Sequence, residues 1–102
     1  MNNIYSLLGL AYRAGKIVWG YQAVVAALRS QKVELVLLAR DGSPGLKTRI
    51  LRFCREYRRQ GLLYGYKNEL GAALGKPPCA VVGITDKNFA FIIRQRVREV
   101  DV

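Results

Sequence analysis

The residues of this chain that are best suited to bind a ligand lie between Ala14 and Gln22. Gly15 suits the left-handed conformation that closes a helix, and the apolar residues after Lys16 favour a short strand. Gly20 is small enough to let the backbone turn, or a ligand approach, where the next helix begins. The first N–H groups of that helix have no partners within it, so they attract anions, and Lys16 stands close by. The pattern predicts an electropositive binding site at the start of this helix.

The charge of the chain indicates a polyanionic partner. Seventeen Lys and Arg residues stand against seven Asp and Glu residues, which gives a net charge of +10 and a predicted pI of about 10.1. Eleven of the basic residues are Arg, whose planar guanidinium suits phosphates, guanine edges and stacking. An acidic protein or a membrane surface would also attract such a chain, and a smaller excess of charge would be enough for solubility. We therefore favour a nucleic acid as the partner.

Catalytic and metal-binding functions lack their usual residues. The 102 residues contain no His, and Cys54 and Cys79 lie far apart, outside any CxxC or Cys/His cluster. Zinc sites and Ser-His or Cys-His catalysis therefore lack their ligands and base, and we expect both cysteines to be reduced core residues. Asp41 and Asp86 are better explained as a turn residue and a helix cap than as a general-base pair. We expect no catalytic residue, no metal and no cofactor.

Length and composition predict a single domain over residues 1–102. Apolar residues make up 51% of the chain, which is enough for one packed core without metal or disulfide staples. No segment approaches the roughly 20 apolar residues of a membrane span, and the N-terminus lacks the pattern of a secretory signal. We therefore expect a cytoplasmic protein without a membrane partner.

Alternating helix and strand patterns predict an α/β fold. The predicted helices cover residues 3–13, 21–28, 44–60, 68–74 and the segment after a cap at Asp86. The predicted strands cover residues 16–19, 35–39, 62–66 and 80–85. The uninterrupted apolar run at 35–39 is typical of an interior strand that is covered on both faces. This order predicts helices on both faces of a central sheet. The helix at 21–28 is apolar nearly all round, so we expect it to be largely buried, with mainly its ends in solvent.

The predicted helix at 44–60 is the most basic part of the chain. Ser43 is its expected N-cap, Pro44 its first residue and Gly61 its stop. Cationic residues cover much of its outer surface: Lys47, Arg49, Arg52, Arg55, Arg58 and Arg59. Such a run is either a solvated helix face or a surface that tracks phosphates, and the sequence leaves both interpretations open.

Several segments together are similar to a known family. They are Ala14, Gly15, Lys16 and Gly20, the segment 35–41, then Glu69, Leu70, Gly71, Ala73 and Gly75, and the segment 80–86. In type and order they resemble the kink-turn RNA-binding superfamily of L7Ae and L30e ribosomal proteins, above all its small bacterial YlxQ branch. The resemblance covers nearly the whole chain. It implies a three-layer α/β/α sandwich with a mixed four-stranded sheet and about five helices, without catalytic activity, that binds sharply bent internal loops of RNA.

The resemblance also implies which residues read the RNA. It places Gly20 on the family's glycine and Gln22 on its asparagine at the start of the second helix. Gln22 keeps an amide that can pair with a base edge. Ala23 and Ala26 stand where the family has a glutamate and a lysine, so two polar readers are missing. Arg40 stands where many relatives carry an acid, which adds positive charge.

The loop over residues 75–79 matches the family's second contact, where small apolar residues usually hold an extruded nucleotide. Lys76 and two prolines make this version stiffer and more charged. Tyr21 is expected to stack on a base, while Lys16 and Arg40 neutralise phosphates. The expected RNA-binding residues are therefore Lys16, Gly20, Tyr21, Gln22, Arg40, Lys76, Pro77 and Pro78. A secondary basic face comprises Lys47, Arg52, Arg55 and Arg59.

The expected function is non-catalytic binding of a bent element of ribosomal or other structured RNA by a ribosome-associated protein that is monomeric when free. The alternative is a basic protein-interaction module that docks on a translation factor or ribosomal protein through the helix at 44–60. Nuclease treatment separates the two, because only the alternative predicts binding that persists after the RNA has been digested.

Overall fold

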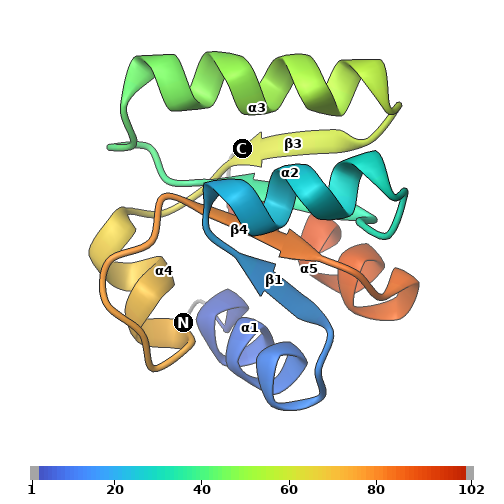
Figure 1. Ribbon diagram of the computed structural model, residues 1–102. Coiled ribbons are helices and arrows are strands. Elements are labelled where there is room, and N and C mark those ends of the chain that lie inside the picture. The colour runs from blue at the N-terminus through green and yellow to red at the C-terminus, as the bar shows by residue number, and fades with distance from the viewer. Residues whose placement is uncertain (1–2, 101–102) are drawn as a thin grey trace.

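The computed structural model describes residues 3–100 and shows five helices and four strands within that range (Figure 1). The helices are α1 (Ile4–Arg13), α2 (Tyr21–Arg29), α3 (Pro44–Glu56), α4 (Lys67–Ala73) and α5 (Lys87–Val100). The strands are β1 (Ile17–Trp19), β2 (Leu35–Leu38), β3 (Gln60–Leu63) and β4 (Val81–Ile84). Among the described residues, every helix is too short or too polar to cross a membrane.

The four strands form one mixed sheet in the order β1, β4, β2, β3. β4 runs antiparallel to both neighbours and pairs Val82 with Trp19 on one side and with Leu37 on the other, while β2 and β3 are parallel. The parallel pair is joined through α3, because parallel strands need a crossover that is longer than a hairpin. The expected mixed four-stranded sheet is confirmed.

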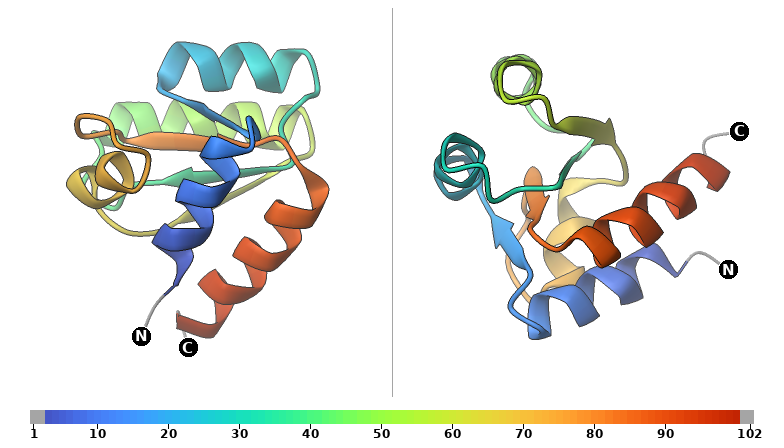
Figure 2. Two further views of the ribbon diagram at one scale, coloured as in Figure 1. Left: turned by 90° about the horizontal axis from the view of Figure 1, so that it is seen from below. Right: turned by 90° about the vertical axis from the view of Figure 1, so that its right-hand side faces the viewer.

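Helices cover both faces of the sheet, which gives three layers (Figure 2). α1, α4 and α5 pack on one face, and α2 and α3 pack on the other. β2 contributes to both cores, because Leu35 and Leu37 face the first group of helices whereas Val36 and Leu38 face the second, and all four are fully buried. The apolar run thus marks a strand covered on both faces, and the predicted α/β/α sandwich is confirmed.

Two predicted helix starts are confirmed by their caps. The Ser43 hydroxyl accepts a hydrogen bond from the Leu46 N–H at 3.2 Å, and Pro44 is the first residue of α3. At the start of α5, a carboxylate oxygen of Asp86 accepts a hydrogen bond from the Phe89 N–H at 2.9 Å. Each side-chain oxygen satisfies an N–H that has no partner inside its helix, so these positions could be identified from the sequence.

The end of α3 differs from the prediction. The helix ends at Glu56, the chain turns through Arg58 with a left-handed φ of 57°, and β3 begins earlier than expected. Gly61, predicted to stop the helix, lies within β3 instead. A Cβ atom there would come within 2.9 Å of Leu51 Cδ2 and 3.3 Å of Cys54 Sγ on α3. The prediction was wrong because this glycine allows the helix to pack closely on the strand and does not redirect the chain.

Both cysteines are buried and carry no disulfide, as predicted. Cys54 is 2% exposed and Cys79 is 5% exposed. Burial of the Cys54 thiol raises its pKa to about 11, and the charge of the neighbouring Arg55 opposes this effect only in part. The thiol is therefore a neutral core group at physiological pH.

Stability should fall at alkaline pH partly because of Cys54. The thiol ionises at lower pH in the unfolded chain than in the folded protein, so rising pH first stabilises the unfolded state. Between about pH 7.5 and pH 10 we expect the wild type to lose about 1 kcal/mol more free energy of unfolding than Cys54→Ala. Urea unfolding of both proteins at the two pH values measures this difference. Equal losses in the two proteins would contradict the raised pKa.

Candidate nucleic-acid interface

Three loops and the start of α2 meet at one edge of the sheet. The Gly20 N–H donates a hydrogen bond to the Val81 carbonyl at 3.0 Å, and the Arg40 N–H donates to the Gly65 carbonyl at 2.8 Å. These backbone bonds hold the segments after β1, β2 and β3 beside the beginning of β4. We call the surface formed by residues 20–22, 40–43 and 76–80 the α2 edge.

Gly20 sets the direction in which α2 leaves the sheet. Its φ of 91° and ψ of 156° form a combination that is essentially restricted to glycine. No side chain caps the helix, and its first backbone bond runs from the Val24 N–H to the Gly20 carbonyl at 3.0 Å. The earlier N–H groups therefore remain for solvent or a ligand, and exposed Gln22 adds an amide beside them. This geometry suits an anion or a base edge.

α2 also exposes two alanines. Ala23 and Ala26 lie on its solvent side, although the helix was predicted to be largely buried with mainly its ends exposed. The prediction was wrong because alanine is apolar yet small, so a helix can expose it at little cost. The positions that the resemblance assigns to a glutamate and a lysine are thus surface positions that carry only methyl groups.

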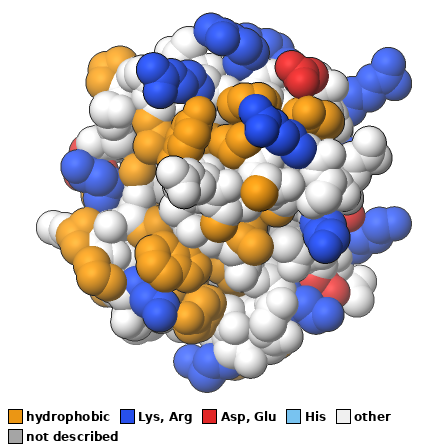
Figure 3. All heavy atoms as spheres, in the orientation of Figure 1, with side chains coloured by type: hydrophobic (Ala, Val, Ile, Leu, Met, Phe, Trp, Pro, Cys, Tyr) orange, Lys and Arg blue, Asp and Glu red, His pale blue; other side chains and the backbone are white. Residues whose placement is uncertain are grey.

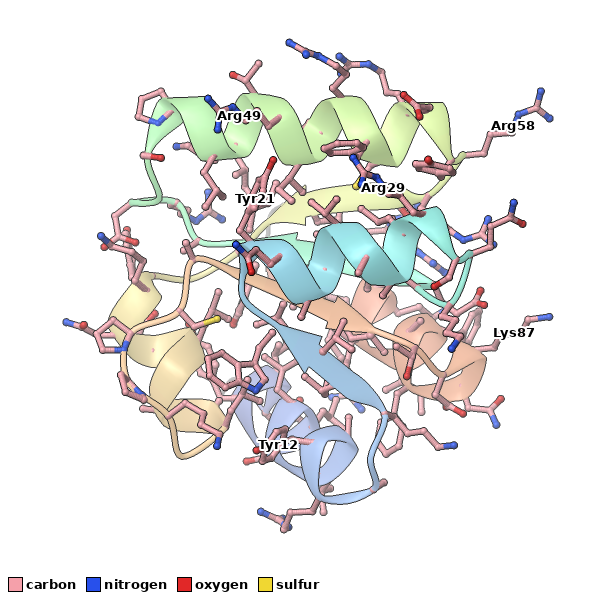
Figure 4. The ribbon with its side chains drawn as sticks, in the orientation of Figure 1. Tyr12, Tyr21, Arg29, Arg49, Arg58 and Lys87 are labelled. Atoms are coloured by element: carbon pink, nitrogen blue, oxygen red, sulfur yellow. The ribbon has the colours of Figure 1, made fainter. Side chains whose placement is uncertain are left out.

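Tyr21 points from the start of α2 towards α3, where Arg49 lies (Figure 4). Its ring is half-buried and packs against the core between the two helices. Tyr21, Ser43, Gly45, Leu46 and Arg49 line an open pocket of about 330 Å³. An aromatic ring and a guanidinium at one pocket can contact a base and a phosphate respectively. Tyr21 thus covers core residues and also borders a space that a ligand can reach.

The turn between β2 and α3 is held from two sides. The Lys47 ammonium donates a hydrogen bond to the Arg40 carbonyl at 2.9 Å, and Asp41 Oδ1 accepts one from the Lys67 N–H at 2.8 Å. Asp41 is therefore a turn residue, as expected from the sequence, and it also accepts a hydrogen bond from the first residue of α4. Within residues 3–100, no group of three or more His, Cys, Asp or Glu side chains could hold a metal ion. The turn presents the exposed Arg40 at the α2 edge.

Lys76, Pro77 and Pro78 form the opposite side of the α2 edge. Both prolines are exposed, whereas Lys76 is half-buried. The Lys76 ammonium lies 5.3 Å from the ring centre of Trp19 and 5.6 Å from that of Tyr12. Sequence reasoning treated Trp19 only as a strand residue. It missed this contact because the three residues come from separate elements, which only the fold brings together.

Lys16 does not lie at the α2 edge. Its carbonyl accepts a hydrogen bond from the Thr85 N–H at 2.9 Å, and Thr85 follows the end of β4. Because β1 and β4 are antiparallel, the end of β4 lies beside the start of β1. Gly20 follows at the other end of the strand, about 13 Å away in an extended chain. The expectation that Lys16 stands close to the start of α2 is therefore wrong.

The secondary basic face divides into exposed and anchored residues. Arg52 and Arg55 are exposed on α3, and Figure 3 shows Lys and Arg side chains along the top of the molecule where α3 lies. Lys47 and Arg59 are only half-exposed. Arg59 lies beyond the end of α3, and its Nε donates a hydrogen bond to the Val33 carbonyl at 2.6 Å. Arg52 and Arg55 are thus the members of this face that are best able to contact a partner.

Comparison with known proteins identifies the family of the chain. The sequence profile described as the ribosomal protein L7Ae/L30e/S12e/Gadd45 family matches residues 2–93. The RNA-binding protein YlxQ of Bacillus subtilis is 35% identical over 86 residues, which cover 84% of this chain and 86% of that protein. The large ribosomal subunit protein eL30 of Candida albicans is 37% identical over 76 residues, which cover 72% of this chain and 71% of that protein.

Solved structures share the fold. A Bacillus halodurans protein of unknown function matches with a TM-score of 0.92 and 32% identity, over 96% of this chain and 99% of that one. The 15.5kD RNA binding protein of Giardia lamblia matches with a TM-score of 0.80 and 22% identity, over 97% of this chain and 85% of that one. This second match supports the fold alone. The relatives form a non-enzymatic family, and this chain is not an enzyme. It belongs to the L7Ae/L30e/S12e/Gadd45 family of ribosomal proteins.

Proposed function

We propose that the chain binds RNA through the α2 edge and that its target is a sharply bent, kink-turn-like element of ribosomal or other structured RNA. The start of α2 carries the proposal, because Gly20 turns the backbone and leaves uncapped N–H groups beside the Gln22 amide. The names of the relatives, an RNA-binding protein and a ribosomal protein, support the same partner. In this proposal, residues 1–102 act as one RNA-binding domain, monomeric when free, in the cytoplasm and in association with the ribosome.

A bent internal loop suits this surface physically. Bases in a regular RNA duplex are hidden in a deep, narrow groove, whereas a sharp bend unstacks bases and exposes their edges. Backbone N–H groups and the Gln22 amide can bond to such edges, while Arg40 and Arg49 neutralise the phosphates that the bend crowds together. Ala23 and Ala26 add no polar contact. Shape and phosphate contacts therefore supply most of the binding in this chain.

The proposal is tested by binding to a kink-turn RNA and to a plain duplex of equal length across a salt series. Five phosphate contacts, each worth roughly 0.7 to 0.9 in the slope of log affinity against log salt, predict a slope of roughly −4. We expect the bent RNA to bind more tightly at every salt concentration. Equal affinity for the two RNAs would contradict recognition of the bend, and a flat salt dependence would contradict the phosphate contacts.

Docking on an acidic translation factor or ribosomal protein is a second candidate function. Arg52 and Arg55 favour it, because both are exposed on α3 and a guanidinium pairs with a carboxylate as readily as with a phosphate. Purification of the protein with its bound partners, with and without nuclease, separates the candidates. A protein partner that stays bound after nuclease treatment would support docking, whereas loss of all partners would support RNA binding.

A further inference from the structure

A second set of cations gathers at the end of the sheet that lies opposite the α2 edge. The Thr85 N–H donates a hydrogen bond to the Lys16 carbonyl at 2.9 Å, so the start of β1 lies beside the end of β4. The Glu34 N–H donates to the Ile84 carbonyl at 2.7 Å, which places the start of β2 there as well. We call this surface the basic end, after its exposed cations Lys16, Lys32, Arg58 and Lys87.

Two arginines fix the loops of the basic end through backbone carbonyl groups. Arg59 Nε donates a hydrogen bond to the Val33 carbonyl at 2.6 Å, which ties the start of β3 to the loop before β2. Arg94 Nη2 donates to the Glu34 carbonyl at 3.5 Å, which ties α5 to the same loop. Neither bond neutralises a guanidinium, because both acceptors are uncharged. Both arginines therefore add positive charge beneath the exposed cations.

The exposed cations of the basic end point into solvent. Figure 4 shows Arg58 and Lys87 extending from the right-hand side of the molecule, away from Tyr21 and Arg49. None of the four exposed cations has a side-chain hydrogen bond or an ion pair with another described residue. Their charges are therefore available to an anionic partner.

Few carboxylates compensate this charge. The acidic residues of the described loops and helix ends nearby are Glu34, Glu56 and Asp86. Glu34 and Asp86 are half-buried, and Asp86 already caps α5. With Arg59 and Arg94 included, six cations stand against three carboxylates. The basic end thus carries a net positive charge of its own.

Two of the exposed cations lower the stability of the free protein. Arg58 has a left-handed φ of 57° just beyond the end of α3, where glycine is normally favoured. Lys87 is the first residue of α5, where the helix dipole repels a positive charge. Folding alone would favour a glycine and a neutral or acidic residue at these positions. Charges that are unfavourable for folding indicate a role in binding.

The chemistry of the basic end favours phosphates over an acidic protein. No large exposed hydrophobic side chain lies in residues 30–34, 57–60 or 84–88, all of which the structure describes. A protein partner would therefore find no apolar or aromatic anchor there, and such anchors supply most of the affinity of protein interfaces. Contacts to RNA phosphates need only positive charge.

We propose that the basic end binds the phosphate backbone of a second RNA segment, so that the protein joins two RNA segments, one at each end of its sheet. The inference rests on the proposed function, which assigns the first segment to the α2 edge. A strand such as β1 separates the two ends by about 13 Å in an extended chain. Because they face in opposite directions, one segment does not block the other.

Capture of a second RNA by the complex tests this proposal. A biotinylated kink-turn RNA is immobilised and saturated with the full chain, and a labelled plain RNA duplex is then titrated at about 0.1 M salt. We expect capture that depends on the protein, with a dissociation constant between roughly 10⁻⁴ and 10⁻⁶ M, as for phosphate contacts alone. Capture of labelled oligoglutamate as tightly as the duplex would assign the basic end to protein docking and overturn the proposal.

A double variant locates the second contact. Arg58→Gly with Lys87→Ala should weaken capture of the duplex roughly 30-fold and make its salt slope shallower by roughly 1.5. Both changes favour folding, so the melting temperature should rise by roughly 4 °C, and unfolding cannot explain the loss. Arg52→Ala with Arg96→Ala is the matched control. It removes two exposed charges from α3 and α5, outside the basic end, and should change capture by no more than about threefold.

The outcomes separate this inference from the proposed function. If the protein binds kink-turn RNA but captures no duplex, or if both double variants lose capture equally, the second site is wrong and the proposed function stands. A large loss of kink-turn binding in Arg58→Gly with Lys87→Ala would show that both RNAs use one surface, which also overturns the second site. If the wild type does not bind kink-turn RNA, the proposed function and the joining of two segments both fail. Titration of the duplex into the free proteins then still tests the basic end, because equal binding by wild type and variant would overturn it.

Discussion

Gly71→Ala is expected to lower the free energy of unfolding by about 3 kcal/mol, at the upper end of the usual cost of overpacking. Gly71 is buried in α4, where the helix meets the loop before β4. An added Cβ would come within 3.0 Å of the Lys76 carbonyl oxygen and still closer to the Pro77 carbonyl. These are backbone atoms of a proline-stiffened loop, so no side-chain rotation relieves the clash. Urea unfolding followed by circular dichroism measures the loss.

Gly45→Ala is the matched control for this substitution. Gly45 lies in α3 with open space at its Cβ position, so alanine should raise stability by about 0.5 to 1 kcal/mol through its helix propensity. Because the displaced loop carries Lys76, Gly71→Ala should also change the emission of Trp19 in the free protein. If Gly71→Ala proves as stable as Gly45→Ala, the close packing of α4 against the loop is wrong.

Arg40→Glu is expected to weaken binding of kink-turn RNA roughly 30-fold at about 0.1 M salt. In the proposed interface, Arg40 makes one phosphate contact at the α2 edge. The substitution removes that contact and puts a repulsive charge in its place, which we count as the loss of two contacts. Each contact contributes roughly 0.7 to 0.9 log units of affinity at this salt concentration relative to 1 M. The salt slope should therefore become shallower by about 1 to 2. Anisotropy of labelled RNA across a salt series measures both quantities.

Lys16→Glu is the control for Arg40→Glu, since it changes the net charge equally but lies at the other end of β1. We expect it to weaken binding by no more than about threefold, through the overall field of the protein alone. Arg40→Lys keeps the charge and should bind nearly as well as the wild type. Equal losses in the two glutamate variants would show that the RNA responds to overall charge and that the α2 edge is not the binding surface.

The order of the elements was predictable from the sequence because each element carries a local signal. Three of these signals are the apolar run of β2, the cap at Ser43 and the cap at Asp86. Each of them depends only on residues that are close together in the chain. The role of Gly61 could not be predicted in this way. It depends on Leu51 and Cys54, which approach the glycine only once α3 has packed on β3. Local conformation was therefore predictable, whereas the space available to a residue was not.

Residues of the candidate site could be predicted from the sequence where they lie on one element. They could not be predicted where their position depends on the direction of a strand. Gly20 follows from the local pattern at the start of α2, and Gln22 follows from the resemblance to the family. Lys16 is close to Gly20 in sequence, but the extended strand between them places it at the opposite edge of the sheet. The contact of Trp19 with Lys76 depends on which loops adjoin the end of β1, and the order of the strands in the sheet determines that.

The position of β4 determines when the sheet can be completed during protein synthesis. β4 is the last strand to be translated, yet it lies between β1 and β2 and is the only strand paired with β1 among residues 3–100. β2 and β3 can pair as soon as both have left the exit tunnel. β1 cannot pair until β4, which ends at Ile84, has also left it. In a nascent chain that stalls before Val81, β2 and β3 are therefore paired but β1 has no partner strand. The exposed strand edges of this state favour aggregation.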